Sequence, residues 1–203
     1  MIPTLNRNVR TVLLLVTVVF LSSCSVFPAR ETFYYALEYS APEAPAEPSV
    51  PGVVRVMEPR ISTAYNRRQI VLRDGTPRFQ YLTDDMWAVD LIDTLQEFVE
   101  RYYNDAGAFE SAIGEFDPGA ADYELYSFIR RVEFLCCDTP EARVEVVFEL
   151  RQPGGAVLLR NELRRDEALP ADDLVAFARG VNELLLASVM EFDARVREAL
   201  GGQ

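Results

Sequence analysis

The stretch Arg143-Val-Glu-Val-Val-Phe-Glu-Leu-Arg151 decides the fold class of this chain. Apolar and charged side chains alternate along it, and Val147 is the one apolar exception. Successive side chains of a strand point to opposite faces, so this period of two predicts a strand with one buried and one solvated face. The apolar members of the alternation are Val144, Val146, Phe148 and Leu150.

The segments around this strand predict the second half of a domain. Pro153-Gly-Gly155 provides a tight turn into a strand over about 156–165, and a strand over about 124–135 precedes the quoted stretch. Pro170-Ala-Asp-Asp173 then opens a long amphipathic helix that runs to about Leu200 and is ended by Gly201-Gly202. This half therefore consists of strands followed by a helix.

The sequence of the first half also predicts strands followed by a helix. Asp84-Asp85 is a plausible N-cap pair for an amphipathic helix whose apolar stripe begins at Trp87. A glycine-punctuated loop is expected over 104–121, and a proline-rich loop over 41–51. The strands expected before the helix cover 32–39, 53–57 and a hairpin of 68–73 with 78–82 around Asp74-Gly75.

These patterns predict an α+β fold. We expect two strand–strand–strand–helix halves that form a largely antiparallel sheet with both helices packed on one face. The expected domain covers residues 32–200, a length sufficient for one compact core.

The N-terminus has the parts of a bacterial lipoprotein signal. Arg7 and Arg10 precede an apolar run, and the small-residue cleavage site Leu21-Ser22-Ser23-Cys24 matches a lipobox. This predicts a signal peptide over 1–23, lipidation of Cys24 and a lipidated tether over 24–31. A short transmembrane anchor and a plain secretory signal are the alternatives, and the apolar run is shorter than the ~20 residues that span a bilayer.

The residue after Cys24 bears on which membrane holds the protein. Ser25 stands where an inner-membrane retention signal usually has Asp. By resemblance to enterobacterial sorting rules, this favours the outer membrane, with the domain on its periplasmic face.

Composition argues against catalysis and against nucleic acid. The chain has no histidine and no lysine, which removes the usual general base, the usual transition-metal ligand and Schiff-base chemistry. It also lacks a phosphate-binding loop, a nucleophile elbow and a metal-spaced cysteine set, so we expect no enzyme, no metal and no cofactor. Without Arg7 and Arg10 the net charge falls from −12 to −14, which disfavours binding to nucleic acid.

Two adjacent cysteines follow the strand expected over 124–135. Cys136 and Cys137 should point to opposite faces, and a bond between them would need a strained ring. One buried thiol with an incidental neighbour is one interpretation. An inter-subunit disulfide in an oxidising periplasm is the other.

The order of several motifs resembles one family. Phe33-Tyr-Tyr-Ala-Leu37, Val54-Arg-Val-Met-Glu-Pro59 and Tyr65-Asn-Arg-Arg-Gln-Ile-Val-Leu-Arg73 follow the lipobox in turn, and Trp87 stands near a helix start. This series is similar to the ABC-type transport auxiliary lipoproteins, the PqiC-like components of MCE lipid-transport systems. The family often has proline shortly after the tryptophan, where this chain has Ala88-Val-Asp90.

The resemblance implies a function and a set of partners. It implies a non-catalytic outer-membrane lipoprotein that works with an MCE-domain protein, an ABC permease and its ATPase. Together these would move phospholipid or other hydrophobic molecules between the inner and outer membranes. Two alternatives stay open: an assembly factor for an outer-membrane barrel or secretin, and a carrier that holds one lipid in its own cavity. Exposed edge strands would also permit a homo-oligomer.

Six residues are candidate contacts for a partner, and each also has a purely structural interpretation. Tyr34 and Tyr35 lie on opposite strand faces, so one can be buried while the other is exposed. The arginines could pair with acidic partner surfaces or could be solvated charges, and the tryptophan could be a contact or a core residue. The candidates are Tyr34, Tyr35, Arg67, Arg68, Arg73 and Trp87.

Overall fold

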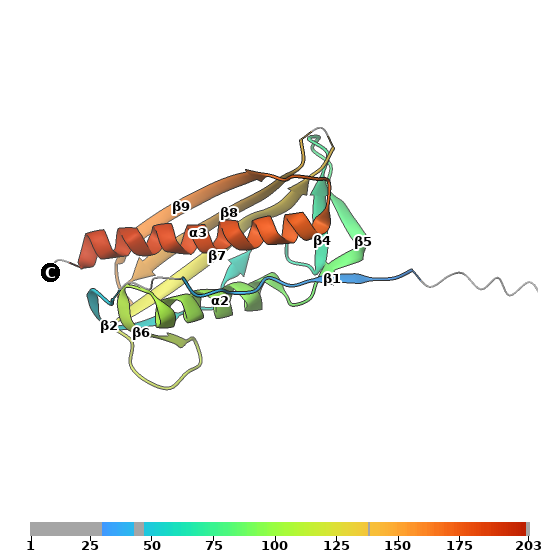
Figure 1. Ribbon diagram of the computed structural model, residues 1–203. Helices are drawn as coiled ribbons and strands as arrows, with labels where there is room; N and C mark the ends of the chain where they lie inside the picture. Colours follow the sequence, from blue (N-terminus) through green and yellow to red (C-terminus); the bar gives the residue numbers. More distant parts are fainter. Residues whose placement is uncertain (1–29, 43–46, 138, 202–203) are drawn as a thin grey trace, which may run out of the picture. The chain divides into compact units, whose positions relative to one another are not determined.

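The computed structural model describes residues 30–42, 47–137 and 139–201. The lipobox residues Leu21, Ser22, Ser23 and Cys24 lie outside the described residues. Residues from Thr32 onward belong to one compact unit, shown in Figure 1. Its strands are β1 (Phe33–Tyr35), β2 (Val50–Val56), β3 (Arg60–Ile61), β4 (Gln69–Arg73), β5 (Gln80–Trp87), β6 (Phe109–Gly114), β7 (Tyr123–Leu135), β8 (Glu141–Arg151) and β9 (Val157–Ala168). Its helices are α2 (Leu91–Asp105) and α3 (Leu174–Leu200).

Strand β7 is the longest strand and organises the sheet. Along one edge it pairs with β8 in an antiparallel ladder from Glu124↔Arg151 to Leu135↔Glu141. Along the other edge it pairs in parallel with β2, β3 and β4 in turn. The chain from 50 to 73 thus runs beside β7 as one interrupted strand.

The remaining strands extend the sheet on both sides. Strand β9 pairs antiparallel with β8, while β6 pairs in parallel with β2. Strand β5 forms the expected hairpin with β4, and β1 pairs in parallel with β5 at the end of the strand order. The α+β class is confirmed, but the sheet is mixed rather than largely antiparallel. Parallel pairs join strands that are separated by long connections, and the local hairpin signals of the sequence do not report them.

Two further differences concern the order of elements. Five strands precede α2, although the fold expectation gave three per half and the individual segments gave four; the additional strand is the two-residue β3, which was not predicted. The segment 104–121 was predicted to be a loop, but it contains the end of α2 and strand β6. Asp84, Asp85 and Trp87 belong to β5, and α2 begins at Leu91 with Asp90 at its N-cap.

Both helices contribute to one core with the sheet, and α2 and α3 lie on the same face (Figure 1). Helix α3 packs on β8 and β9, and α2 packs on β6 and β2. The two helices also meet through a buried polar contact in which the Tyr102 hydroxyl donates to Asp193 at 3.4 Å. Asp173, in the segment expected to open this helix, caps α3, since its carboxylate accepts from the backbone N–H groups of Val175 and Ala176.

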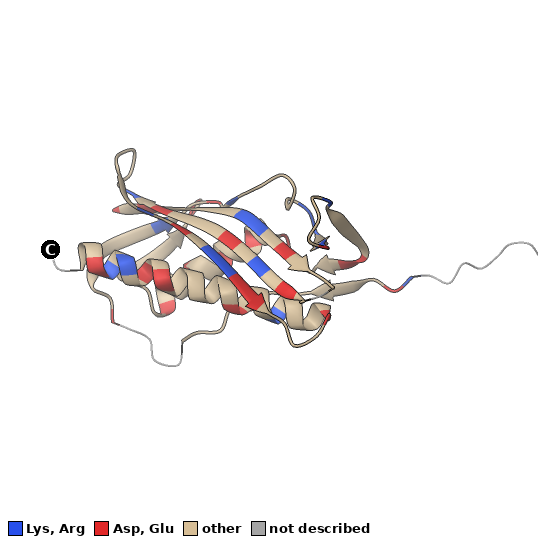
Figure 2. Cartoon of the chain, turned by 90° about the horizontal axis from the view of Figure 1, so that it is seen from above, with Lys and Arg blue, Asp and Glu red and all other residues tan. Residues whose placement is uncertain are grey.

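The other face of β8 differs from the expectation of a solvated face. Glu145 and Glu149 are buried, with 6% and 8% of their surface exposed. Arginines of the neighbouring strands cover them: Arg164 pairs with Glu145 and Arg160 with Glu149. Figure 2 shows acidic and basic positions side by side on the strands of the sheet. Long arginine side chains can lie across the sheet while the guanidinium remains hydrated. They therefore cover the glutamates on the face of the sheet that has no helices.

Candidate functional site

The structure places all six predicted contact residues on or beside three neighbouring strands, β1, β5 and β4. Tyr34 and Tyr35 lie on β1, Trp87 ends β5, and Arg73 ends β4. Arg67 and Arg68 immediately precede β4. Because β1 pairs with β5 and β5 pairs with β4, residues from three separate motifs come together on neighbouring strands at one side of the sheet (Figure 1).

Trp87 is part of the core at this edge. Only 3% of its surface is exposed, and its ring lies 5.7 Å from that of Phe177 on α3. The strand assignment explains this burial, because the side chain points toward the helices rather than along a helix surface. Trp87 therefore has the core role, and a partner could not reach it in this conformation.

The two tyrosines of β1 have different environments, as the strand alternation predicts. The hydroxyl of half-buried Tyr35 donates to Asp85 at 2.9 Å, and burial together with this carboxylate raises the pKa of Tyr35 to about 12. Tyr34 has 59% of its surface exposed, and the Arg68 guanidinium lies 5.6 Å from the centre of its ring. Tyr35 thus positions β1, while Tyr34 remains available for an external contact.

Arg68 holds the end of β5 in place. Its guanidinium donates to the carbonyl oxygen of Trp87 at 3.1 Å and to that of Ala88 at 2.6 Å. It has no carboxylate partner among the described residues. The side chain therefore orders the connection to α2 through backbone carbonyl groups.

Arg67 and Arg73 stack on two exposed aromatic rings of β5 and the turn before it. The Arg67 guanidinium lies 3.7 Å from the ring centre of Tyr81, and Arg73 lies 4.4 Å from that of Phe79. The two rings stack on each other with centroids 6.4 Å apart. We call Arg67, Arg73, Phe79 and Tyr81 the arginine–aromatic surface. Cation–π contacts hold its guanidinium groups in fixed positions.

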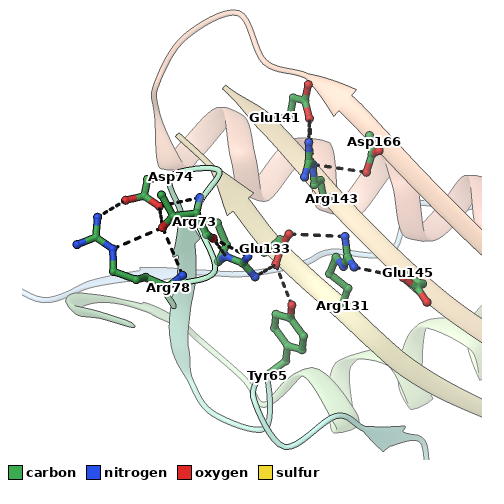
Figure 3. A network of polar contacts seen from close by, with 11 residues as sticks. Tyr65, Arg73, Asp74, Arg78, Arg131, Glu133, Glu141, Arg143, Glu145 and Asp166 are labelled. Carbon is green, nitrogen blue, oxygen red and sulfur yellow. Dashed lines mark hydrogen bonds and ion pairs between the residues drawn. The ribbon is translucent and has the colours of Figure 1, made fainter. Parts of the chain in front are cut away.

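A buried carboxylate supports this surface from below. Glu133 on β7 is 2% exposed and accepts from the Tyr65 hydroxyl at 2.8 Å. It also pairs with Arg73 at 3.5 Å and with Arg131 at 3.8 Å. Figure 3 shows how Glu133 joins these side chains. Burial and this carboxylate raise the pKa of Tyr65 well above its usual value, so the hydroxyl remains a donor.

A groove lies beside β1. Its volume is about 540 Å³, and it lies between β1 and the first half of α3. Phe33, Tyr34 and Val175 line it, with 51%, 59% and 56% of their surfaces exposed. Glu38, Arg179 and Glu183 supply charges at its margin. Strand β1 is the last strand of the sheet on this side, so the groove is open to solvent.

The chemistry of this end is that of binding surfaces. In the part of the chain that the structure describes, no group of three His, Cys, Asp or Glu side chains is arranged to hold a metal ion. No helix within the described ranges is long and apolar enough to cross a membrane. The arrangement offers guanidinium groups, exposed aromatic rings and an open apolar groove.

Sequence reasoning missed four of the residues that build this end: Tyr65, Phe79, Tyr81 and Glu133. Phe79 and Tyr81 alternate along the predicted strand over 78–82 and share a face with Arg73 in the hairpin, so the period of two could have identified them. Tyr65 and Glu133 are far apart in sequence, and only the sheet brings them together.

The two cysteines lie at the end of β7. Cys136 is half-buried and Cys137 is exposed, and both are free thiols. Cys137 has a positive φ of 89°. Burial raises the pKa of the Cys136 thiol to about 11, which disfavours the reactive thiolate.

The fold and this end of the domain define a class: an α+β domain with a mixed sheet, two helices on one face and surfaces suited to binding. A family described as ABC-type transport auxiliary lipoprotein component matches residues 35–191. The chain therefore belongs to the ABC-type transport auxiliary lipoproteins, as its motifs suggested.

Solved structures share the fold. Protein XCC0632 from Xanthomonas campestris superposes with a TM-score of 0.72 at 21% identity, over 84% of this chain and 97% of that one. An uncharacterized protein superposes with a TM-score of 0.64 at 9% identity, over 82% of this chain and 99% of that one. No curated protein matches the chain.

Proposed function

We propose that this protein is a non-catalytic, lipid-anchored subunit of an MCE/ABC transport system, held at the periplasmic face of the outer membrane. It would join an MCE-domain protein, with its ABC permease and ATPase, to that membrane during movement of phospholipid or other hydrophobic molecules. The observation that carries the proposal is the family match over residues 35–191, which follows directly behind a lipobox at Cys24.

The ionisable groups support a role without catalysis. Asp193, which is 2% exposed, accepts the Ala108 backbone N–H at 2.7 Å and pairs with Arg197 at 2.7 Å inside the core. Glu133 likewise serves Tyr65 and two arginines. Catalytic acids and bases usually face a cleft. These carboxylates instead satisfy buried donors, which is a structural task.

The arginine–aromatic surface is the proposed docking site for the protein partner. Its rings are partly exposed, at 39% for Phe79 and 37% for Tyr81, and its guanidinium groups are already ordered by stacking. Aromatic and arginine side chains are enriched at the energetic centres of protein interfaces. We infer a partner segment that brings carboxylates to Arg67 and Arg73 and an apolar side chain to the rings.

The anchor can be tested by mass spectrometry of the mature protein and by membrane fractionation. We expect a triacylated Cys24 as the first residue and recovery with the outer membrane. Cys24→Ala should leave the signal uncleaved at this position and remove the acyl chains. A wild-type N-terminus without lipid, or recovery with the inner membrane, would contradict the proposed anchoring or location.

The docking site can be tested with one variant that introduces a negative charge and with a matched control. Tyr81→Asp places a carboxylate between the stacked rings, where it would repel an acidic partner. Val157→Asp on β9 changes a residue of similar exposure, 50%, at the other side of the sheet. We expect Tyr81→Asp to reduce recovery of the MCE-domain protein and Val157→Asp to leave it unchanged. Equal recovery with both variants, at equal thermal stability, would rule out this docking site.

A further inference from the structure

A cluster of exposed apolar side chains near β1 is not part of the proposed docking site for the protein partner. Phe33, Tyr34, Val89 and Val175 are large apolar side chains, and each has between 51% and 59% of its surface exposed. Three of them line the groove between β1 and α3. Val89 is nearby, because the backbone N–H of its neighbour Ala88 donates to the Tyr35 carbonyl oxygen at 2.8 Å. We call these four residues the β1 patch.

The position of the β1 patch in the chain restricts what it can touch. About nine residues separate Cys24 from Phe33, and at about 3.4 Å per residue a fully extended chain spans only about 30 Å. If Cys24 carries the lipid, the β1 patch cannot move farther than this from the membrane surface. Figure 1 shows that β1 and the beginning of α3 lie at the same end of the domain, so the whole patch shares this restriction.

We propose that the β1 patch rests on the lipid surface in which the anchor is embedded, with Phe33 and Tyr34 in the interfacial region of the bilayer. This inference rests on the proposed lipid anchor but not on the transport partner. Tyrosine suits such a place because its ring is apolar and its hydroxyl can remain hydrated. The domain would then have two attachments, the acyl chains and the β1 patch, and a fixed orientation relative to the membrane.

The charges near the patch fit a lipid surface that is contacted mainly through apolar groups. Arg68, next to Tyr34, and Arg179, at the groove, have no carboxylate partner among the described residues, so they can face lipid phosphates. Glu38 and Glu183 line the same groove and offset that attraction. With an overall charge of −12 before processing, the protein gains little from anionic lipid. Contact should therefore depend on the apolar side chains and should be insensitive to salt.

The arrangement also has a consequence for the arginine–aromatic surface. The β1 patch lies beside residues 85–87 at the end of β5, whereas Phe79 and Tyr81 lie at the beginning of that strand. Contact of the β1 patch with the membrane would therefore fix the orientation of the arginine–aromatic surface relative to the membrane, because both belong to one compact unit. A partner arriving from the periplasm would then meet a preoriented docking site, which lowers the entropic cost of binding.

The test uses the full lipidated chain in vesicles of phosphatidylethanolamine and phosphatidylglycerol. Cys136→Ser and Cys137→Ser remove the free thiols, and single cysteines at positions 34 and 175 carry an environment-sensitive fluorophore. Matched control positions are 116 and 157, since Phe116 is 87% and Val157 50% exposed and neither lines the groove. We expect emission at 34 and 175 to shift to shorter wavelength and to be quenched several-fold by spin-labelled lipid. Emission at 116 and 157 should not change.

The outcomes separate this inference from the proposed function. Labels at 34 and 175 that behave like those at 116 and 157, in protein that floats with the vesicles, would overturn the membrane contact and leave the anchor intact. Labels that are shielded only in intact cell envelopes would assign the patch to a protein and also overturn it. A chain that does not float would refute both the anchor and this inference. Failure to recover an ABC partner would affect only the proposed function.

A second pair of variants tests the contact without a label. Tyr34→Glu and Val175→Glu add charge to side chains that are already exposed, so both should fold normally. We expect each to increase protease access to the tether in vesicles, while Val157→Glu does not. Unchanged access with both patch variants would overturn the contact.

Discussion

At the scale of single residues, Glu133 is the carboxylate on which the arginine–aromatic surface depends. It is buried and accepts from Tyr65, whose own surface is 6% exposed. Removing the carboxylate would leave a buried hydroxyl without a partner. This lowers the free energy of unfolding more than removing both partners of the hydrogen bond together.

This asymmetry gives a prediction that unfolding experiments can check. Tyr65→Phe should lower the free energy of unfolding by about 1 kcal/mol and Glu133→Ala by about 3 kcal/mol. The double variant should lose clearly less stability than the sum of the two single losses. When the Tyr65 hydroxyl is absent, Glu133→Ala no longer leaves a buried donor without an acceptor. Arg78→Ala, in an exposed ion pair with Asp74, is the control and should cost under about 0.5 kcal/mol. Additive losses in urea titrations would show that the two residues do not act together.

Asp193 gives a prediction about pH. Burial raises its pKa above the usual value, although Arg197 and the Ala108 N–H partly oppose the shift. A raised folded-state pKa means that its contribution to stability is present below the unfolded pKa of about 4 and is lost as pH rises through the folded pKa. Asp193→Asn removes this dependence, so the variant should gain stability relative to the wild type as pH rises from acid toward neutral. A relative stability that falls over this range would contradict the assignment.

The same position tests the buried backbone bond. Asn at 193 keeps an oxygen that can accept the Ala108 N–H, whereas Asp193→Ala leaves this buried donor unsatisfied. We expect Asp193→Ala to lose about 2 kcal/mol more than Asp193→Asn in denaturant titrations at acid pH. Equal losses would show that the bond to Ala108 contributes little.

At the scale of elements, the two helix starts provide a matched comparison. Asp173 accepts from the backbone N–H groups of Val175 and Ala176, while Asp90 makes no side-chain cap bond. Asp173→Ala should therefore cost about 1 kcal/mol and Asp90→Ala only a few tenths, from the lost charge at the helix N-terminus. Thermal unfolding of both variants measures the difference. A larger loss for Asp90→Ala would contradict the described caps.

The elements also show what the sequence could and could not predict. Strands β8 and β9 and helix α3 were predicted well, because a tight turn, a period of two and an amphipathic stripe are local signals. The parallel pairing of β2, β3 and β4 with β7 was not predicted, since no local signal reports it. Trp87 was placed on a helix because its spacing to Leu91 fits a helical stripe. In the structure, β5 ends at this residue and the helix begins only after Asp90.

The candidate site shows the same limit. The six predicted contact residues came from separate motifs, and the β1–β5 and β4–β5 pairs bring them to neighbouring strands. Which of them are accessible depends on which face each strand presents, so the sequence left Tyr34 and Tyr35 undecided. Glu133, which orders Arg73, lies 60 residues away in sequence.

At the scale of the whole molecule, the domain combines a mixed sheet, a helix layer and one edge that carries two different surfaces. The arginine–aromatic surface is charged and ordered, and the β1 patch is apolar and near the proposed anchor. The first suits a protein partner with carboxylates, and the second suits lipid. In our proposal the domain uses these two surfaces to connect a membrane with a transport assembly.

The measurement that tests this account most directly is copurification of the tagged, lipidated protein from native membranes in mild detergent, with mass spectrometry of the proteins and lipids recovered. We predict recovery of an MCE-domain protein together with an ABC permease and its ATPase, and reduced recovery with Tyr81→Asp but not with Val157→Asp. Recovery of an outer-membrane barrel or secretin without ABC components, or of stoichiometric lipid without a protein partner, would contradict the account.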